Sequence, residues 1–173
     1  YRIRDRVESS IMAQYQLAVP TQQRYYQRLF AMRQALIIDP QQLELLSSLA
    51  ELYFDTGRID LAFDMIEQAL VMIRALPDSS FNDQTLQLAQ RLNQVKQQIA
   101  PQIETVKNRI DEASLEANFD RIQFAAALHQ AGYPGNALAM LEEDRLLVAQ
   151  NPASQVQLAL LLAESGRLEE SAS

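Results

Sequence analysis

The sequence predicts an all-α protein, and three observations support this fold class. The 173 residues include only four glycines and six prolines, far fewer turn residues than a sheet protein of this length needs. Apolar residues make up 48% of the chain, and Ala, Leu, Gln and Glu, all good helix formers, are abundant. Apolar positions recur at intervals of three and four residues, as on one face of a helix. We therefore expect one helical domain with a packed core.

The first half of the chain is expected to form four helices separated by clear breaks. Pro20 ends the first helix. Asp39 and Pro40 end the second and start the third, because Asp caps free amides and Pro fits a first helical turn. Gly57 can end the third helix in the left-handed conformation, and Asp60 is expected to cap the fourth. The predicted helices cover residues 4–18, 22–38, 43–56 and 61–76.

A glycine-free middle segment, residues 81–117, follows a loop with possible caps at Asp78, Ser79 and Ser80. Its apolar residues step by 4, 3, 4, 4, 3, 4 and 3, a heptad-like seam with one stutter. Pro101 lies inside the segment and leaves two alternatives. The segment is one long kinked helix, or it is a degenerate hairpin with Pro101 in the first turn of the second helix. The seam residues are Leu88, Leu92, Val95, Ile99, Ile103, Val106, Ile110 and Ala113.

The last third of the chain predicts three more helices, which brings the total to about eight. Gly132 closes the first of them, and Asn151 with Pro152 repeats the Asp39–Pro40 device. The predicted helices cover residues 119–131, 136–150 and 154–165.

Three segments share a sequence pattern in which a glycine precedes a small residue by five positions: Gly57 and Ala62, Gly132 and Ala137, Gly166 and Ser171. Gly132 and Gly166 are 34 residues apart. This period and this sequence pattern resemble the tetratricopeptide repeat, a helix–turn–helix unit. The best copy has Leu46, Leu49, Ala50 and Tyr53 followed by Ala62, Ile66, Ala69 and Leu70; the second has Phe124, Ala125, Leu128, Gly132, Ala137 and Leu141; the third has Leu158, Ala159, Leu162 and Gly166.

The resemblance implies a single tetratricopeptide-like α-solenoid over residues 1–173, with an irregular middle. Repeats are expected at about 1–76 and 118–173, the last one truncated, on either side of the 81–117 helix or hairpin. The pattern lapses at Arg121 and Asp144. Because the chain starts without methionine and stops in mid-pattern, we expect a piece of a longer protein, and a membrane anchor elsewhere in that protein stays open; cytoplasm and periplasm fit equally well.

The resemblance also implies that the first helix of each hairpin lines a concave groove that holds a partner peptide or helix. The groove would be acidic with one aromatic in its first half and apolar in its second. Two alternatives stay open for the apolar part: the protein's own long helix or another part of the chain fills it, or a partner helix does. The expected groove residues are Glu44, Ser47, Glu51, Phe54, Asp55, Phe119, Ile122, Ala126, His129, Val156 and Leu160.

Several function classes find no support in the residues. A net charge of −7 with only two lysines argues against nucleic acid as a ligand. The chain has no cysteine and one histidine, His129, so neither a thiolate nor a multi-histidine metal site is expected. There is no phosphate-binding glycine loop or nucleophile elbow, and no apolar run long enough for a membrane span. We expect no enzyme activity and no cofactor.

The expected function is a non-catalytic scaffold that binds another protein or peptide. Two alternatives remain: self-assembly through the 81–117 seam, which would give a homodimer, or a docking domain of a larger enzyme. The seam itself fits packing within one chain or between two chains.

Overall fold

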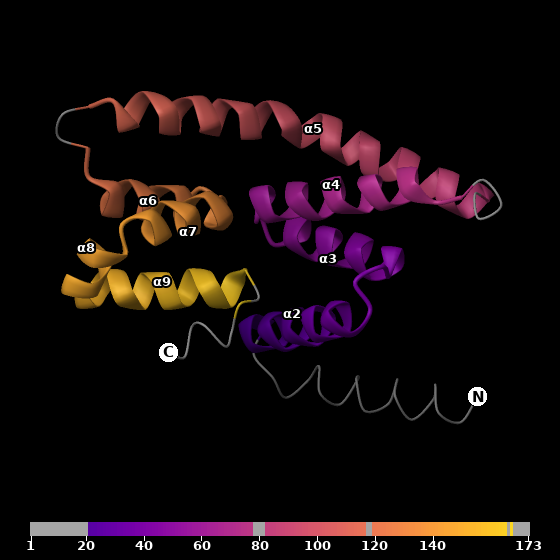
Figure 1. The fold of residues 1–173 in the computed structure, drawn as a ribbon, viewed down its shortest axis with the longest axis horizontal. Helices are drawn as coiled ribbons and strands as arrows, with labels where there is room; N and C mark the ends of the chain where they lie inside the picture. Colours follow the sequence, from indigo (N-terminus) through magenta and orange to yellow (C-terminus); the bar gives the residue numbers. More distant parts are fainter. Residues whose placement is uncertain (1–20, 78–81, 117–118, 166, 168–173) are drawn as a thin grey trace.

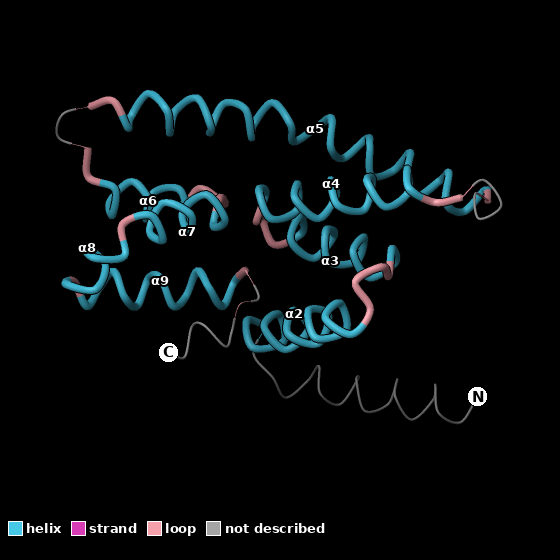
Figure 2. Tube along the Cα trace, in the orientation of Figure 1, coloured by secondary structure: helices cyan, strands magenta, loops and turns pink. Residues whose placement is uncertain are grey.

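The computed structural model describes residues 21–77, 82–116, 119–165 and 167. Within these ranges the secondary structure is helical throughout and no residue lies in a strand (Figure 2), which confirms the all-α prediction. The predicted helix over residues 4–18 lies outside the described residues. The described helices are α2 (Thr21–Ile38), α3 (Leu43–Asp55), α4 (Ile59–Ala75), α5 (Asp83–Ser114), α6 (Arg121–Gln130), α7 (Pro134–Glu143), α8 (Arg145–Gln150) and α9 (Pro152–Glu164).

The helices form three rows (Figure 1). The long helix α5 runs along one side of the molecule, and α2 and α9 run along the other. Two antiparallel hairpins, α3–α4 and α6–α7, lie between these rows and point toward each other. Their turns meet near the middle of the molecule.

Both hairpin turns close in the way that the glycines predicted. Gly57 and Gly132 have φ values of 73° and 90°, in the left-handed region that a Cβ disfavours. The N–H of Arg58 donates to the Tyr53 carbonyl at 2.8 Å, and the N–H of Tyr133 donates to the Leu128 carbonyl at 2.9 Å. This pairing is the outer hydrogen bond of a Schellman motif, so both turns use the same C-terminal cap.

The third predicted turn is described only in part. Gly166 lies outside the described residues. The backbone N–H of Arg167 donates to the Leu162 carbonyl at 2.8 Å, which is the same six-residue closure as at the other two turns.

The two described turns are bonded directly to each other. The N–H of Ile59 donates to the Gly132 carbonyl at 2.8 Å. A Cβ added to Gly132 would overlap the Gly57 carbonyl oxygen. The hairpins therefore meet turn to turn, and a solenoid in which these hairpins stack side by side is not confirmed.

Asp60 is not the cap residue of α4, so its predicted position is wrong. The helix begins at Ile59, one residue before Asp60, and Arg58 holds the cap position without a side-chain hydrogen bond. One oxygen of the Asp60 carboxylate accepts from the N–H of Leu61, in the first turn of α4, at 2.8 Å. The other oxygen accepts from the backbone and side-chain nitrogens of Asn136, at 2.7 and 3.0 Å, so one side chain serves both the start of the helix and the contact between the hairpins.

Two other predicted features also differ from the structure. Helix α3 begins at Leu43 as predicted, but Asp39 does not cap it: the Asp39 carboxylate accepts from the N–H of Gln41 at 3.2 Å, so Asp39 and Pro40 form a turn before the helix. The single helix predicted over 136–150 is two helices, α7 and α8, separated at Asp144. Asn151 caps α9 as predicted, with Pro152 in the first helical position.

The middle segment is one helix, which decides against the degenerate hairpin. Helix α5 has 32 residues, and the Asn82 side chain caps it by accepting from the N–H of Thr85 at 2.9 Å. Pro101 lies inside and lacks the N–H for one helical bond. Ile99 and Ile103 are buried on either side of it, so packing holds the helix together across the proline.

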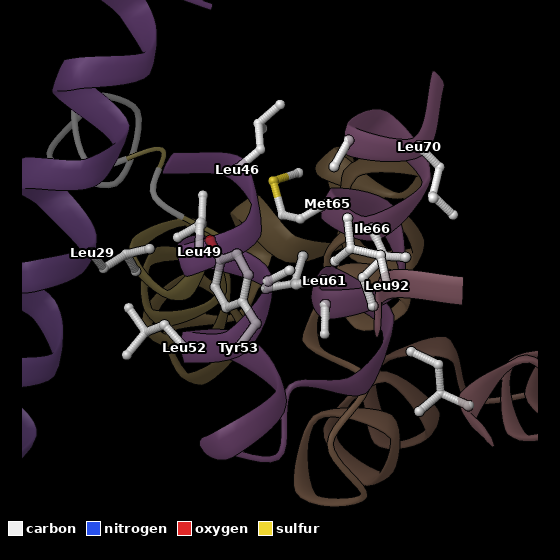
Figure 3. Close-up of a cluster of buried hydrophobic side chains, with 14 of the residues drawn as sticks. Leu29, Leu46, Leu49, Leu52, Tyr53, Leu61, Met65, Ile66, Leu70 and Leu92 are labelled. Atoms are coloured by element: carbon white, nitrogen blue, oxygen red, sulfur yellow. The ribbon is translucent and has the colours of Figure 1, made fainter. Parts of the chain in front are cut away.

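The seam of α5 packs on both hairpins. Leu92 and Ile99 join a core cluster with α2, α3 and α4, shown in Figure 3. Val106 joins a second cluster with α6, α7, α8 and α9. The seam therefore packs within the chain, the first of the two alternatives, and α5 links the two cores.

Candidate partner-binding site

Three of the predicted groove residues, Glu51, Phe54 and Asp55, lie together where α3 faces α5. They line a pocket of about 150 Å³, here named the first pocket. Phe54 is 37% exposed and stands at its edge. The pocket wall is completed by Ala50, Ile66, Arg91, Leu92 and Val95.

The rim of the first pocket is acidic. Glu51 and Asp55 line the pocket, are exposed and lie about one helical turn apart on α3, whereas Glu44, seven residues before Glu51, is exposed on the same face but does not line the pocket. Arg91 of α5 approaches Glu51 at 3.6 Å, but both side chains are more than half exposed. A pair of this kind contributes about 0–1 kcal/mol, so it is easily exchanged for a partner's cation.

Ser47 does not face an open groove. It is only 8% exposed, and its hydroxyl donates to the Glu44 carbonyl at 2.9 Å. Because this local hydrogen bond satisfies the hydroxyl, a small serine can be buried on the helix at low cost. The prediction that Ser47 lines the groove is therefore wrong.

The predicted groove residues in and just before α6, apart from His129, are partly buried. Phe119 and Ile122 are partly buried and pack against the second core cluster together with Ile110 of α5. The Phe119 and Phe124 rings meet edge to face, with centroids 5.3 Å apart. Phe119 and Ile122 thus pack within the chain, on a cluster formed by residues of α5 to α9, and Ala126 is half-buried.

A second pocket, of about 230 Å³, lies between α5 and α6. Sequence reasoning missed it, as it missed Arg91, Leu92 and Val95 in the first pocket. Periodicity shows which face of α5 is apolar but not which hairpin residues lie opposite each turn. The lining of the second pocket is Val106, Arg109, Phe124, Ala127, Leu128, Ala131 and Tyr133.

His129 belongs to a charged junction between the hairpins and α9. Its Nε2 lies 3.0 Å from the carboxylate of Glu164, which is only 6% exposed. The Arg58 guanidinium donates to the other oxygen of Glu164 at 2.9 Å, and the Tyr26 hydroxyl lies 3.4 Å from the same atom. His129 therefore faces Glu164, and the network joins α2, α6 and α9 to the first hairpin turn.

The junction borders a shallow polar cavity of about 310 Å³, lined by both hairpin turns. Arg58 also lies over the Tyr25 ring, with 4.3 Å between guanidinium carbon and ring centroid. Burial raises the pKa of the Tyr25 hydroxyl far above its usual range. In the described part of the chain, no group of three or more His, Asp or Glu side chains is placed to hold a metal ion.

Asp60 has the most perturbed carboxyl at the turn-to-turn contact. Burial raises its pKa to about 6, against the opposing effect of hydrogen bonds from Asn136 and Leu61. The side chain is therefore close to its titration point near neutral pH.

Val156 and Leu160 lie on α9, away from both pockets. They are 71% and 40% exposed, as predicted for open positions, but neither lines the first or second pocket. The predicted groove residues thus do not form one groove: Ser47 is buried, Glu44 is exposed on α3 outside the pocket, and most of the others are divided among the first pocket, the second core, the junction and α9.

None of the described helices is long and apolar enough to cross a membrane. No model of a known protein family, no curated protein and no solved structure matches the chain. The resemblance to the tetratricopeptide repeat therefore rests on the residues quoted above.

Proposed function

We propose that this protein is a non-catalytic scaffold of tetratricopeptide-like hairpins that binds a segment of a partner protein at the first pocket. The observation that carries the proposal is the pocket itself, with an apolar wall, a half-exposed aromatic residue, Phe54, and an acidic rim. Exposed aromatic side chains beside a desolvated pocket are common anchors of protein interfaces.

The size and charge of the first pocket select the occupant. At about 150 Å³ it is smaller than the roughly 300–1,000 Å³ of typical cofactor and drug sites, so it suits one apolar side chain. The acidic rim of Glu51 and Asp55 favours lysine or arginine next to that side chain. The proposed ligand is a peptide segment with an apolar anchor flanked by basic residues.

Small residues inside both hairpins support the repeat interpretation. Ala62 and Ala137 each follow a turn glycine by five positions, and each is fully buried. Residues of this size let paired helices approach closely. Helix α9 contributes Leu161 to the second core with α7, the position in which the next repeat of an array would stack.

The scaffold proposal is favoured over self-assembly by the seam of α5. Leu92, Ile99 and Val106 are buried within the chain, so self-assembly through the seam would have to expose both cores.

A peptide selection with matched variants tests the proposal. A displayed library of 16-residue peptides is selected on the immobilised chain, and enriched peptides are measured by fluorescence anisotropy. Phe54→Asp should weaken binding at least tenfold, about 1.4 kcal/mol. Phe30→Asp is the control, because Phe30 is 44% exposed on α2 and lines neither pocket, and it should leave binding within twofold. Peptides that bind Phe54→Asp as tightly as the native chain would refute the proposal, as would the absence of any enriched peptide.

A further inference from the structure

The two pockets lie on the same side of α5. Arg91 and Val95 line the first pocket, and Val106 and Arg109 line the second. Counted from Arg91, the other three follow after 4, 15 and 18 residues, close to one, four and five whole helical turns. The four side chains therefore share one face of α5.

The stretch of this face between the pockets is polar. Gln98 and Gln102 fall seven and eleven residues after Arg91, near two and three whole turns, and both are exposed. Each amide side chain can donate and accept hydrogen bonds. The apolar residues next to them, Ile99 and Ile103, are buried under the helix. The face is thus an apolar pocket, two amides and a second apolar pocket in a row.

We propose that the first and second pockets are two subsites of one binding track along α5, occupied by an extended peptide with two apolar anchors. This inference rests on the proposed function. The pocket centres are about 14 to 15 residues apart on α5, or about 22 Å. An extended chain covers that distance in about seven residues at roughly 3.3 Å each.

The amides of Gln98 and Gln102 favour an extended occupant over a helical one. In a helix the backbone N–H and C=O groups bond to each other, whereas an extended segment presents them to its surroundings. The charges along the track also set the direction in which the peptide binds. The acidic rim of the first pocket suits a basic residue at the first anchor, and Arg109 suits an acidic residue at the second.

A designed peptide tests the track on the full 173-residue chain. It carries two leucines seven positions apart, Lys before the first, Glu after the second, and alternating Ser and Thr between them. Two further peptides replace one leucine each by serine. Fluorescence anisotropy should show that the two-leucine peptide binds at least tenfold more tightly than either single-leucine peptide.

Variants of the protein assign each leucine to its pocket. Phe54→Asp should abolish the contribution of the first leucine and leave that of the second. Ala127→Glu, at an exposed position in the second pocket, should do the reverse. Ala149→Glu on α8 is the matched control, because Ala149 is also exposed and lines neither pocket, and it should change nothing. Circular dichroism of each variant confirms that the fold is retained.

The possible failures separate the two proposals. If the second leucine adds nothing and Ala127→Glu has no effect, while Phe54→Asp still weakens binding, the track is wrong and the proposed function stands. Tighter binding by a helical peptide with leucines fifteen positions apart would overturn the extended occupant. If no designed peptide binds, the track is overturned, and the library selection alone decides the proposed function.

Discussion

Replacing Gly132 by alanine tests the contact between the hairpin turns, and Gly57 supplies a matched control. Both glycines have positive φ, 90° and 73°, so an alanine at either site is strained by about 1–2 kcal/mol. Their surroundings differ. A Cβ at Gly57 meets nothing within 4 Å, whereas a Cβ at Gly132 overlaps the backbone carbonyl oxygen of Gly57.

The expected difference between the two variants follows from this geometry. Alanine lowers the entropy of the unfolded chain, which offsets about 0.4–1 kcal/mol of the strain, so Gly57→Ala should cost about 1 kcal/mol. In Gly132→Ala the turns must also separate. This breaks the hydrogen bond from Ile59 to Gly132 and disturbs the bonds from Asn136 to Asp60, for a further cost of about 2–3 kcal/mol.

Urea and thermal unfolding followed by circular dichroism at 222 nm measure both variants. For a chain of this size, the excess cost of Gly132→Ala corresponds to a melting temperature roughly 5–10 °C below that of Gly57→Ala. If the two variants unfold with equal free energies, within about 0.5 kcal/mol, the turns do not touch and the reasoning fails.

Three further substitutions probe the core, the hairpins and the buried carboxyl. The pKa of Asp60 is about 6 in the folded chain and 3.8 in the unfolded one, so protonation of Asp60 stabilises the fold fully below pH 3.8, and this stabilisation is lost as the pH rises through 6. Between pH 7.5 and pH 4.5 the unfolding free energy of the native chain should therefore rise by about 2 kcal/mol relative to that of Asp60→Asn. A difference between the two chains that does not change with pH would contradict this prediction. Ala62→Leu should overpack the α3–α4 contact by about 1–3 kcal/mol, whereas Ala75→Leu at an exposed position should not; an unchanged melting temperature for Ala62→Leu would count against the close approach of the helices. Ile99→Ala should lower the unfolding free energy by about 2–5 kcal/mol and leave the molar mass measured by light scattering unchanged. If the native chain is a dimer, and the variant is a monomer of normal stability, the seam joins two chains and the prediction is wrong.

Local patterns in the sequence predicted most helices and both described turns, because these depend on neighbouring residues. Gly57 and Gly132 have the left-handed conformation that a helix end requires. The core side of α3 and α4 also followed from periodicity, since Leu49, Tyr53 and Ile66 are buried as expected.

The arrangement of the hairpins could not be predicted in the same way. Helix α5 is about 48 Å long, whereas α4 is about 26 Å, so α5 carries the chain past the first hairpin before the second begins. The second hairpin then points back toward the first, and the turns meet. A repeat period records similarity along the chain and contains no information about this reversal.

The candidate site was predicted in part for the same reason. Glu51, Phe54 and Asp55 were identified because they flank the core positions of α3. Their neighbours Arg91 and Val95 could not be assigned, because the register of α5 against the hairpins depends on long-range packing. Ser47 was misplaced, since periodicity alone does not show that a small polar residue can be buried.

The distance between the far ends of the two hairpins tests the turn-to-turn arrangement most directly. The chain has no cysteine, so single cysteines at the exposed positions Ala75 and Gln123 can carry spin labels without background labelling. Helical rise from the meeting turns to these positions places them roughly 35 Å apart. Double electron–electron resonance should show a distribution centred at about 35 Å or more, whereas side-by-side hairpins would bring the labels to within about 20 Å and contradict the account.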